Sequence, residues 1–311
     1  LSRLICGSEG TLGLITEIEL QLDTLPPKYS ALIAAHFDSV SATLSAVKTT
    51  MKHKLYACEM MDDTILDCTK NHLKYKDYRF FIVGKPKAIL LLELKANSKD
   101  DLKQNIDALQ ADLKQHTECF AQPILKGDNI QKAFTLRKAG LGLLGSIVSD
   151  DKAVACIEDT AVDIEDLESY ISDFDKLMKH YQQDPVYYAH AGAGELHLRP
   201  ILNLKTQKGV NDFVAITNQV AQLVKQYNGS LSGEHGDGIV RSNFIELMLG
   251  DTCFDLIKQV KTTFDPSQIF NPGKIVDPYP INKNFRYETD RIEPKIESFL
   301  NFNNEKDILR A

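Results

Sequence analysis

Apolar and polar positions alternate along this chain of 311 residues with two different periods. Apolar runs of strand length lie at 31–37, 54–60 and 88–96. Between and after them, apolar residues recur every three or four positions, the spacing of an amphipathic helix, at 39–52, 99–115, 163–182 and 206–227. Strands that alternate with helices, without a Gly-rich nucleotide loop after the first strand, predict an α+β fold in which helices cover a sheet.

The two ends of the chain have a different pattern. Residues 12–22 alternate apolar and polar side chains after a Gly-rich turn, which predicts a half-buried strand that ends before Pro26 and Pro27. The polar, weakly periodic tail from Asp277 onward predicts either an extended segment that wraps the domain or a connector. The first residue is Leu, and no basic stretch precedes an apolar one as in a signal peptide, so we expect a piece of a longer protein.

Composition narrows the class of protein. Lys and Arg number 36 against 43 Asp and Glu, a net charge of -7 that argues against a nucleic-acid-binding surface. Apolar runs fall well short of the roughly 20 residues that span a bilayer, so no transmembrane segment is expected. The six cysteines are far apart and form no CxxC pair, which argues against disulfides or a cysteine metal site and is typical of a reducing cytoplasm.

Two glycine-flanked segments carry metal-binding residue types. His190 and His197 lie at the two ends of HAGAGELH, between two short strand-like runs, so a hairpin would place both rings on one face. In GEHGDG at 233–238, Glu234 could complete a His₂Glu site and leave His235 free as a base. Taken singly, the histidines are also compatible with hydrogen-bonded structural residues, and the second segment with a polar turn capped by Asp237.

Two further segments are less specific. Three glycines between Gly7 and Gly13 would let backbone N–H groups approach a ligand closely, although a tight turn explains them equally well. Arg137, Arg199 and Arg241 lie in or beside the motif segments of a chain with only eight arginines, and arginine suits bidentate contact with a carboxylate. For each arginine taken singly, a solvated helix face remains the alternative.

In their order and spacing, these segments resemble the C-terminal (cap) part of FAD-linked oxidases of the vanillyl-alcohol oxidase type, in the D-lactate and D-2-hydroxyglutarate dehydrogenase branch. The matching stretches are GSEGTLGLITE at 7–17, HAGAGELH at 190–197, GEHGDG at 233–238 and FDPSQIFNPGKI at 264–275.

The resemblance implies an antiparallel sheet of ferredoxin-like topology covered by helices. It assigns residues 1–27 to the end of the FAD-binding domain, with one remnant strand, 28–276 to the substrate cap, and 277–311 to a connector toward a C-terminal domain. The chain would then be an internal fragment of a longer FAD protein, and the resemblance allows an iron–sulfur cluster in the further domain.

The resemblance also implies roles for single residues. His190, His197 and Glu234 match ligands of a divalent metal, taken as zinc although such ligands accept several ions, and His235 matches the catalytic base. The flavin-lining positions are Gly7, Ser8, Gly10, Thr11, Leu12, Gly13 and Asn271.

Three basic residues are predicted to contact substrate. Arg137 and Lys152 match positions that bind the substrate carboxylate. Arg199 departs from the Asn of many relatives, as Glu195 does, and we expect its charge to favour a dicarboxylic hydroxy acid.

The predicted function is oxidation of a D-2-hydroxy acid, of the D-2-hydroxyglutarate or D-lactate type, to the 2-oxo acid by hydride transfer to FAD. The chain alone is expected to be inactive. One alternative is a metal-stabilised structural or docking cap without catalysis. Another is a membrane-associated D-lactate dehydrogenase, which the net charge of -7 does not support. We expect a cytoplasmic protein and leave open peripheral contact with the inner membrane, the electron acceptor and the oligomeric state.

Overall fold

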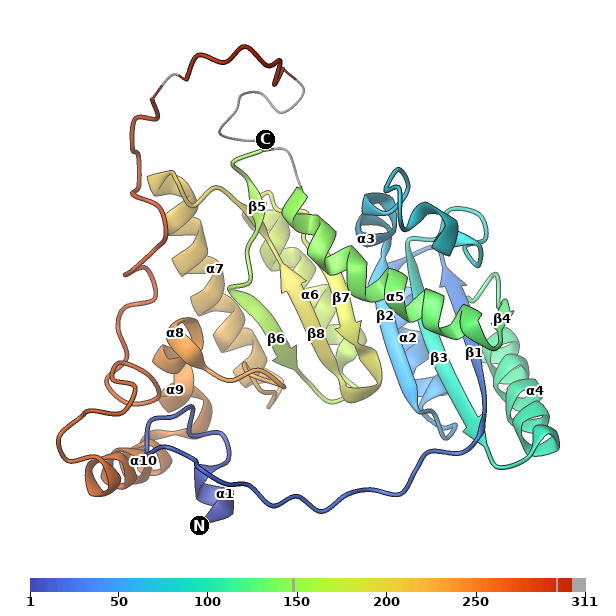
Figure 1. Cartoon of the computed structure of the whole chain (residues 1–311), viewed down its shortest axis with the longest axis horizontal. Coiled ribbons are helices and arrows are strands. Elements are labelled where there is room, and N and C mark those ends of the chain that lie inside the picture. Colours follow the sequence, from blue (N-terminus) through green and yellow to red (C-terminus); the bar gives the residue numbers. More distant parts are fainter. Residues whose placement is uncertain (147–148, 295, 304–311) are drawn as a thin grey trace.

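The computed structural model describes residues 1–146, 149–294 and 296–303 and is built on one antiparallel sheet of seven strands (Figure 1). In spatial order the strands are β4 (Ile124–Leu125), β1 (Tyr29–Phe37), β3 (Ala88–Ala96), β2 (Ala57–Asp62), β7 (Val186–His190), β8 (Glu195–Arg199) and β6 (Ile157–Ala161). A separate two-stranded sheet pairs β5 (Lys152–Ala153) with β9 (Ile201–Leu202).

The sheet is built from two units of the same topology. The first runs β1, α2 (Val40–Thr50), β2, β3, α4 (Lys99–His116), β4, which is the βαββαβ order of a ferredoxin-like fold. The second runs β6, α6 (Leu167–His180), β7, β8, α7 (Gln207–Gln226), and a bridge between Ala161 and Ser230 takes the place of its last strand. The units join where β2 pairs with β7, so the predicted α+β class and ferredoxin-like topology are confirmed.

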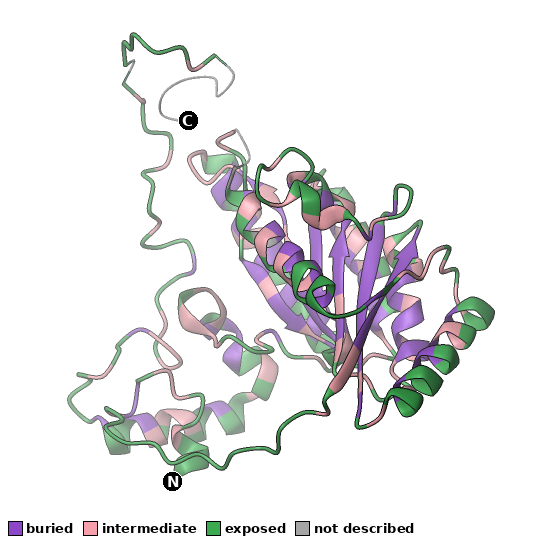
Figure 2. Ribbon diagram, turned by 45° about the vertical axis from the view of Figure 1, so that its right-hand side comes forward, coloured by how far each residue is buried: buried purple, intermediate pink, exposed green. Residues whose placement is uncertain are grey.

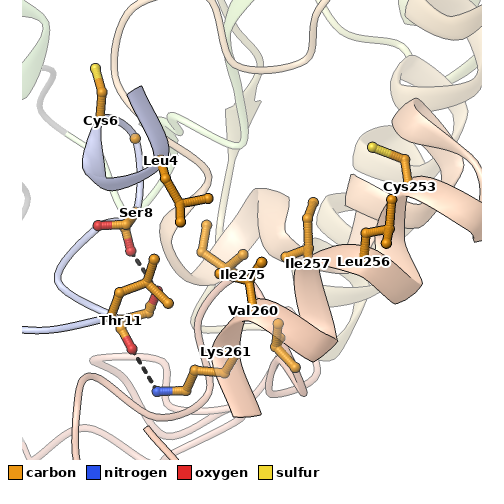
Figure 3. Close-up of a pocket in the computed structure, with 13 residues that line it drawn as sticks. Leu4, Cys6, Ser8, Thr11, Cys253, Leu256, Ile257, Val260, Lys261 and Ile275 are labelled. Atoms are coloured by element: carbon orange, nitrogen blue, oxygen red, sulfur yellow. Dashed lines mark hydrogen bonds between the residues drawn. The ribbon is translucent and has the colours of Figure 1, made fainter. Parts of the chain in front are cut away.

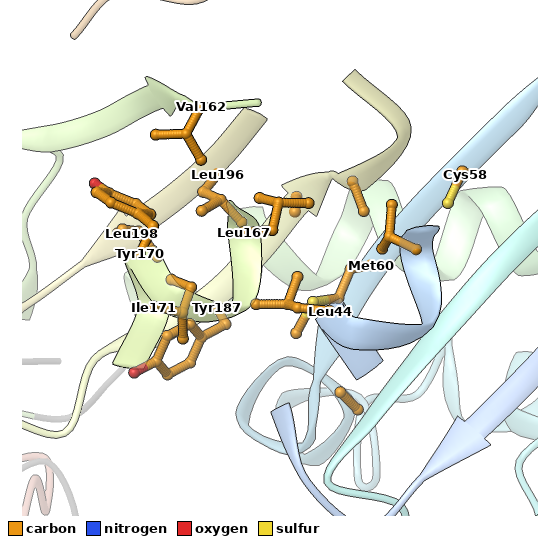
Figure 4. Close-up of a cluster of buried hydrophobic side chains, with 14 of the residues drawn as sticks. Leu44, Cys58, Met60, Val162, Leu167, Tyr170, Ile171, Tyr187, Leu196 and Leu198 are labelled. Atoms are coloured by element: carbon orange, nitrogen blue, oxygen red, sulfur yellow. The ribbon is translucent and has the colours of Figure 1, made fainter. Parts of the chain in front are cut away.

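Helices cover the two faces of the sheet unequally. A core cluster on one face joins the strands to α2, α4, α6 and α7 (Figure 4), and Leu44, Tyr170 and Phe174 are fully buried in it. A smaller cluster on the other face joins the strands to α3 (Asp63–Cys68) and α5 (Asp128–Leu143) and includes Leu136. Because β1 is buried from both sides, it reads as a continuous apolar run rather than an alternating one (Figure 2).

Helix boundaries follow capping chemistry. The side chains of Ser39, Ser98 and Thr206 accept backbone N–H groups at the starts of α2, α4 and α7, and such caps stabilise a helix by about 1 kcal/mol each. The predicted helices therefore begin within a residue or two of the observed ones, except that α6 starts at Leu167. The strand expected at 54–60 is displaced to β2.

The prediction of a strand at 12–22 was wrong. This segment is extended, but no strand of the described residues lies beside it to complete a ladder, and it crosses below the sheet as an arm (Figure 1). Leu12 at its start is buried, but the apolar side chains that follow are exposed, Leu14 and Leu22 by more than 80%. Alternation indicates only that one side of a segment is suited to burial, and the partner surface must come from elsewhere.

The remaining elements lie outside the main core. α1 (Ser2–Ile5) and α10 (Asp251–Phe264) lie close together, and α8 (Gly238–Arg241) and α9 (Ile245–Leu249) lead into α10 (Figure 1). Short 3-10 turns complete the chain: η1 (Lys76–Arg79), η2 (Leu144–Ser146), η3 (Ala191–Ala193) and η4 (Ser242–Phe244).

The described part of the tail has no helix or strand and lies along α7. Phe285 packs on Phe213 with ring centroids 5.2 Å apart, and Glu293 pairs with Lys205. Residues 304–311 of the predicted connector lie outside the described residues. Within the described chain, none of the helices combines the length and apolar character needed to cross a bilayer.

Candidate functional site

The hairpin of β7 and β8 places two histidines on one face of the sheet. His190 pairs with Glu195 and Tyr188 with His197, so the two histidines are diagonal neighbours with ring centroids 5.2 Å apart. Gly194 makes the turn: its φ is +72°, and a Cβ there would lie 2.0 Å from the Val162 carbonyl oxygen. A residue with a side chain is excluded at this point, so the glycine of the motif is a steric requirement.

The loop at 233–238 brings Glu234 to this pair. Glu234 Oε1 lies 3.5 Å from His190 Nε2 and 3.7 Å from His197 Nε2. One ligand atom from each of the three residues lies within 4.8 Å of the others. An ion bonded at about 2.0–2.1 Å to tetrahedral ligands holds neighbouring ligand atoms about 3.4 Å apart, so these distances fit a zinc-like site.

The protonation tendencies of the histidines differ. Burial, with the charges of His190 and Arg137, lowers the pKa of the 3% exposed His197 to about 4, so its ring is neutral, the form that binds a metal. A hydrogen bond to Glu59 outweighs burial and raises the pKa of His190. The negative surroundings that favour a proton on His190 would equally favour a bound cation.

Glu59 was not predicted, and it links two predicted residues. Its Oε2 lies 2.9 Å from His190 Nδ1 and 2.5 Å from Arg137 Nη2. Arg137 also donates to the Ala189 carbonyl at 2.9 Å, and its guanidinium lies over the Tyr188 ring, 4.0 Å from the centroid. The predicted substrate arginine is thus buried and already held by the protein.

His235 lies beside Glu234, and its ring centroid is 5.9 Å from that of His197. Its Nε2 is 3.5 Å from Glu234 Oε1 and 3.6 Å from Glu158 Oε1, and its side chain is 49% exposed. The other oxygen of Glu158 makes an ion pair with Arg199. Arg199 therefore lies beside the site as expected, but the unpredicted Glu158 compensates its charge.

A second group of ligand types shares His197. Glu158, His197 and His235 also offer ligand atoms within 4.8 Å of one another. Glu195 is also buried, and burial together with a hydrogen bond to Asp159 raises the pKa of its carboxyl group to about 7. One proton shared between these two carboxyl groups relieves the repulsion between buried negative charges.

Lys152 lies in β5, in the separate two-stranded sheet, opposite Leu202. It is exposed, and its role in binding a carboxylate stays a prediction.

The predicted flavin-lining loop lies against α10 (Figure 3), and hydrogen bonds join it to the loop of His235. Glu9 accepts the Asp237 N–H at 2.5 Å and the Gly238 N–H at 2.9 Å, and Asn271 donates to the Glu9 carbonyl at 2.7 Å. Lys261 of α10 donates to the Thr11 carbonyl at 2.8 Å. The structure therefore brings together two predicted flavin segments and the base loop, and the first of these segments is more than 220 residues from the other two in the sequence.

The same loop faces open space. A Cβ built on Gly7, Gly10 or Gly13 would meet no atom within 4 Å. An apolar cavity of about 300 Å³ lies between the loop and α10, lined among others by Leu4, Leu12 and Ile257. Backbone that is accessible at glycines fits close approach by a planar ring or a phosphate.

A second cavity, of about 350 Å³, opens beside the candidate metal ligands. Its lining includes the polar residues Glu59, His190 and Glu234 as well as Met51, Leu55 and Tyr56. A small acid with an apolar or short polar side chain could reach the ligand residues from this cavity.

The residues missed by sequence reasoning are all acids: Glu59, Glu158, Asp159 and Glu195. Each lies on a strand, and its exposed fraction is low. A charged residue inside a buried strand is the available signal, because such residues are rare without a partner.

Comparison with known proteins places the chain in a family. The model of the family "FAD linked oxidases, C-terminal domain" matches residues 26–275. A D-2-hydroxyglutarate dehydrogenase of Haemophilus influenzae is 32% identical over 94% of this chain and 30% of its own length. One of Pseudomonas putida is 30% identical over 89% of this chain and 28% of its length. The chain thus spans less than a third of these relatives.

The fold has solved counterparts. A 4-ethylphenol oxidase from Gulosibacter chungangensis superposes with a TM-score of 0.57 over 80% of this chain and 54% of that one, at 11% identity. A p-cresol methylhydroxylase gives a TM-score of 0.52 at 10% identity. With a family model matching most of its length, the chain belongs to the family of FAD-linked oxidase C-terminal domains.

Proposed function

We propose that this chain is the substrate- and metal-binding part of a flavin-dependent dehydrogenase that oxidises a D-2-hydroxy acid to the 2-oxo acid. The observation that carries the proposal is the convergence of His190, His197 and Glu234 within 4.8 Å, with His235 beside them. Relatives named D-2-hydroxyglutarate dehydrogenase at about 30% identity support the substrate class.

The three ligand residues would hold a divalent ion, taken as zinc. A metal in this site supplies a Lewis acid that lowers the pKa of the substrate hydroxyl. His190 presents Nε2 to the site because Glu59 holds its Nδ1, and His197 is neutral because it is buried. The donor set of two imidazoles and one carboxylate leaves a coordination position for substrate.

His235 would take the hydroxyl proton. Glu158, 3.6 Å from its Nε2, stabilises the imidazolium that results, as a carboxylate does beside a catalytic histidine. Arg137, fixed by Glu59 and stacked on Tyr188, provides a rigid positive charge that orients the substrate carboxylate. The flavin supplies the acceptor for the two electrons and hydrogen released at C2.

The flavin segments of this chain have a positioning role. Glu9 joins the loop at 7–13 to the backbone beside His235, so the position of the base is coupled to that of the flavin-lining glycines. Because both segments are fixed by hydrogen bonds, the base and the cofactor would approach the substrate with little reorganisation.

The test uses the flavoprotein that carries this chain, with His235→Ala, His197→Ala and His116→Ala. His116 is exposed at the end of α4, far along the chain from the site, and serves as the control. We expect one divalent ion per chain, lost only in His197→Ala. Bleaching of the flavin by D-2-hydroxyglutarate or D-lactate should fall by about 100-fold or more in His235→Ala, with flavin content unchanged. Near-normal bleaching in that variant, or no ion in the unmodified protein, would refute the proposal.

A further inference from the structure

Asp159 has an unusual backbone and an unusual environment. It lies at the register shift of β6, between Glu158 and Thr160, and its φ is +83°, a region that residues other than glycine rarely adopt. Its side chain is fully buried. Strain of this kind persists only where the surroundings enforce it, and it is concentrated at functional sites.

Asp159 accepts several hydrogen bonds from residues 232–235. Its carbonyl oxygen accepts the Gly233 N–H at 2.8 Å. Its two carboxylate oxygens accept separate amides: Oδ1 takes the Glu234 N–H at 2.7 Å, and Oδ2 takes the His235 N–H at 3.0 Å. The Ser232 hydroxyl donates to Oδ2 at 3.2 Å. One side chain thus fixes two consecutive peptide groups, those of the third ligand and of the base.

Arg241 completes this arrangement from the other side. Its Nη1 lies 3.6 Å from Asp159 Oδ2 and donates to the Glu158 carbonyl at 2.6 Å, while its Nε donates to the Gly236 carbonyl at 3.0 Å. The buried charge of Asp159 therefore has a cationic partner as well as amide donors, the condition under which a buried carboxylate is retained.

From this geometry we infer that Asp159 is the positioning residue that holds Glu234 and His235 in place for metal binding and proton transfer. The inference rests on the proposed function for what the two residues do there. Asp159 itself contacts neither ligand atoms nor the imidazole of His235 in these bonds; it acts through backbone. A displacement of about 1 Å of such a loop is enough to cost on the order of 100-fold in rate.

The matched control is Asp62. It is also buried, 2% exposed, and it also accepts two backbone N–H groups, from Ile65 at 2.9 Å and from Tyr187 at 2.8 Å. Neither donor belongs to the site. Asp62→Asn thus makes the same substitution in a buried aspartate that accepts two amides, and it leaves the loop at 233–238 untouched.

The first measurement is amide hydrogen exchange in the metal-free flavoprotein with Asp159→Asn and Asp62→Asn. An Asn presents one oxygen and one NH₂, so one of the two amides loses its acceptor and faces a donor. We expect exchange at 233–236 to rise about tenfold or more in Asp159→Asn and to stay unchanged in Asp62→Asn. Unchanged exchange in a folded Asp159→Asn, or an equal rise in the control, overturns the inference.

The second measurement is Co²⁺ affinity, followed by the visible absorption of the bound ion. Asp159→Asn should bind Co²⁺ about 10–100-fold more weakly than the unmodified protein, because outer residues that orient ligands have effects of this size. Equal affinity contradicts the positioning role. Failure of the unmodified protein to bind Co²⁺ contradicts the proposed metal centre instead, and the exchange result still decides the role of Asp159.

Ser232→Ala covers the case in which Asp159→Asn does not fold. It removes one donor to Asp159 and one acceptor, the oxygen that takes the Gly236 N–H at 2.9 Å, while both carboxylate–amide bonds remain. We expect a smaller change in the same direction, about threefold faster exchange at 233–236. No change in this variant together with an unfolded Asp159→Asn would mean that the aspartate serves the fold and not the site.

Discussion

Substitution of Glu59 by Gln should weaken metal binding through the tautomer of a histidine. Both partners of Glu59, Arg137 Nη2 and His190 Nδ1, carry N–H groups: the carboxylate forms an ion pair with Arg137 and a hydrogen bond with His190. Gln has one oxygen. If that oxygen faces Arg137, the NH₂ group faces His190 Nδ1, which must then accept, so the ring proton moves to Nε2 and blocks the atom that faces Glu234.

The substitution should lower both metal affinity and stability. Outer-shell partners of a ligand histidine contribute about 10–100-fold to metal affinity, and we expect a loss in that range for Glu59→Gln. The side chains of Glu59 and Arg137 are 16% and 9% exposed, so breaking the pair leaves a buried cation. The free energy of unfolding of the metal-free protein should therefore fall. The fall should be limited to about 3 kcal/mol, because Arg137 still bonds to a carbonyl and stacks on Tyr188.

The assay is zinc competition against a chromogenic chelator, with urea denaturation of the metal-free protein beside it. Glu93→Gln is the control: Glu93 is 14% exposed in the neighbouring strand and pairs with Lys95 at 3.4 Å, away from the histidines. It should lower stability without changing zinc affinity. If Glu59→Gln binds zinc as tightly as the unmodified protein, Glu59 does not orient His190 and the reasoning fails.

Three further predictions concern the fold around the site. Burial lowers the pKa of His36, whose Nε2 accepts a backbone N–H, so the unfolded state binds more protons and the free energy of unfolding should fall as pH drops through about 6.5. Urea denaturation from pH 7.5 to 5.5 should show a smaller fall in His36→Gln than in the unmodified protein, and an identical fall would exclude His36 as a cause. Gly194→Ala should lower the free energy of unfolding by about 2 kcal/mol or more, since its methyl would lie 2.0 Å from a carbonyl oxygen. In the control Gly142→Ala, in α5, the methyl meets no atom within 4 Å, so thermal melting should show an unchanged or higher stability. Lys261→Met removes three hydrogen bonds of a buried ammonium, so it should cost about 3 kcal/mol and speed thermolysin cleavage at the leucines and isoleucines of the arm at 12–28. Equally fast cleavage in Lys258→Met, a more exposed position of α10, would contradict a specific role.

The sequence was sufficient for most of the long elements and for the proximity of candidate ligands that are close in the chain. His190 and His197 are joined by a hairpin whose glycine is visible in the motif, so their proximity follows from local geometry. The strand at 12–22 was mispredicted because alternation contains no information about which surface covers the apolar side. Local patterns therefore predict local structure, and they fail where a partner from elsewhere in the protein is needed.

The supporting acids could not be derived in this way. Glu59 is 131 residues from His190, and the two meet only because the two ferredoxin-like units join at β2 and β7. Asp159 is 75 residues from Glu234 and contacts it at a register shift that the hydrophobic pattern of the sequence does not predict. Such contacts depend on the order of strands in the sheet, which sequence pattern alone does not determine.

The charges of these acids also change the interpretation of Arg199. Alone, an arginine two residues beyond a ligand would favour a substrate with a second carboxylate, but here it pairs with Glu158, as Arg137 pairs with Glu59. Arg241 lies beside Asp159, and within the part of the chain that the structure describes no arginine forms an ion pair with Glu234. The arginines are therefore compensated, and the site carries an excess of negative charge that repels an anionic substrate. In the proposed function a divalent ion reverses this excess, so the ion, rather than Arg199, would make the site attractive to a hydroxy acid, and more so to a dicarboxylic one.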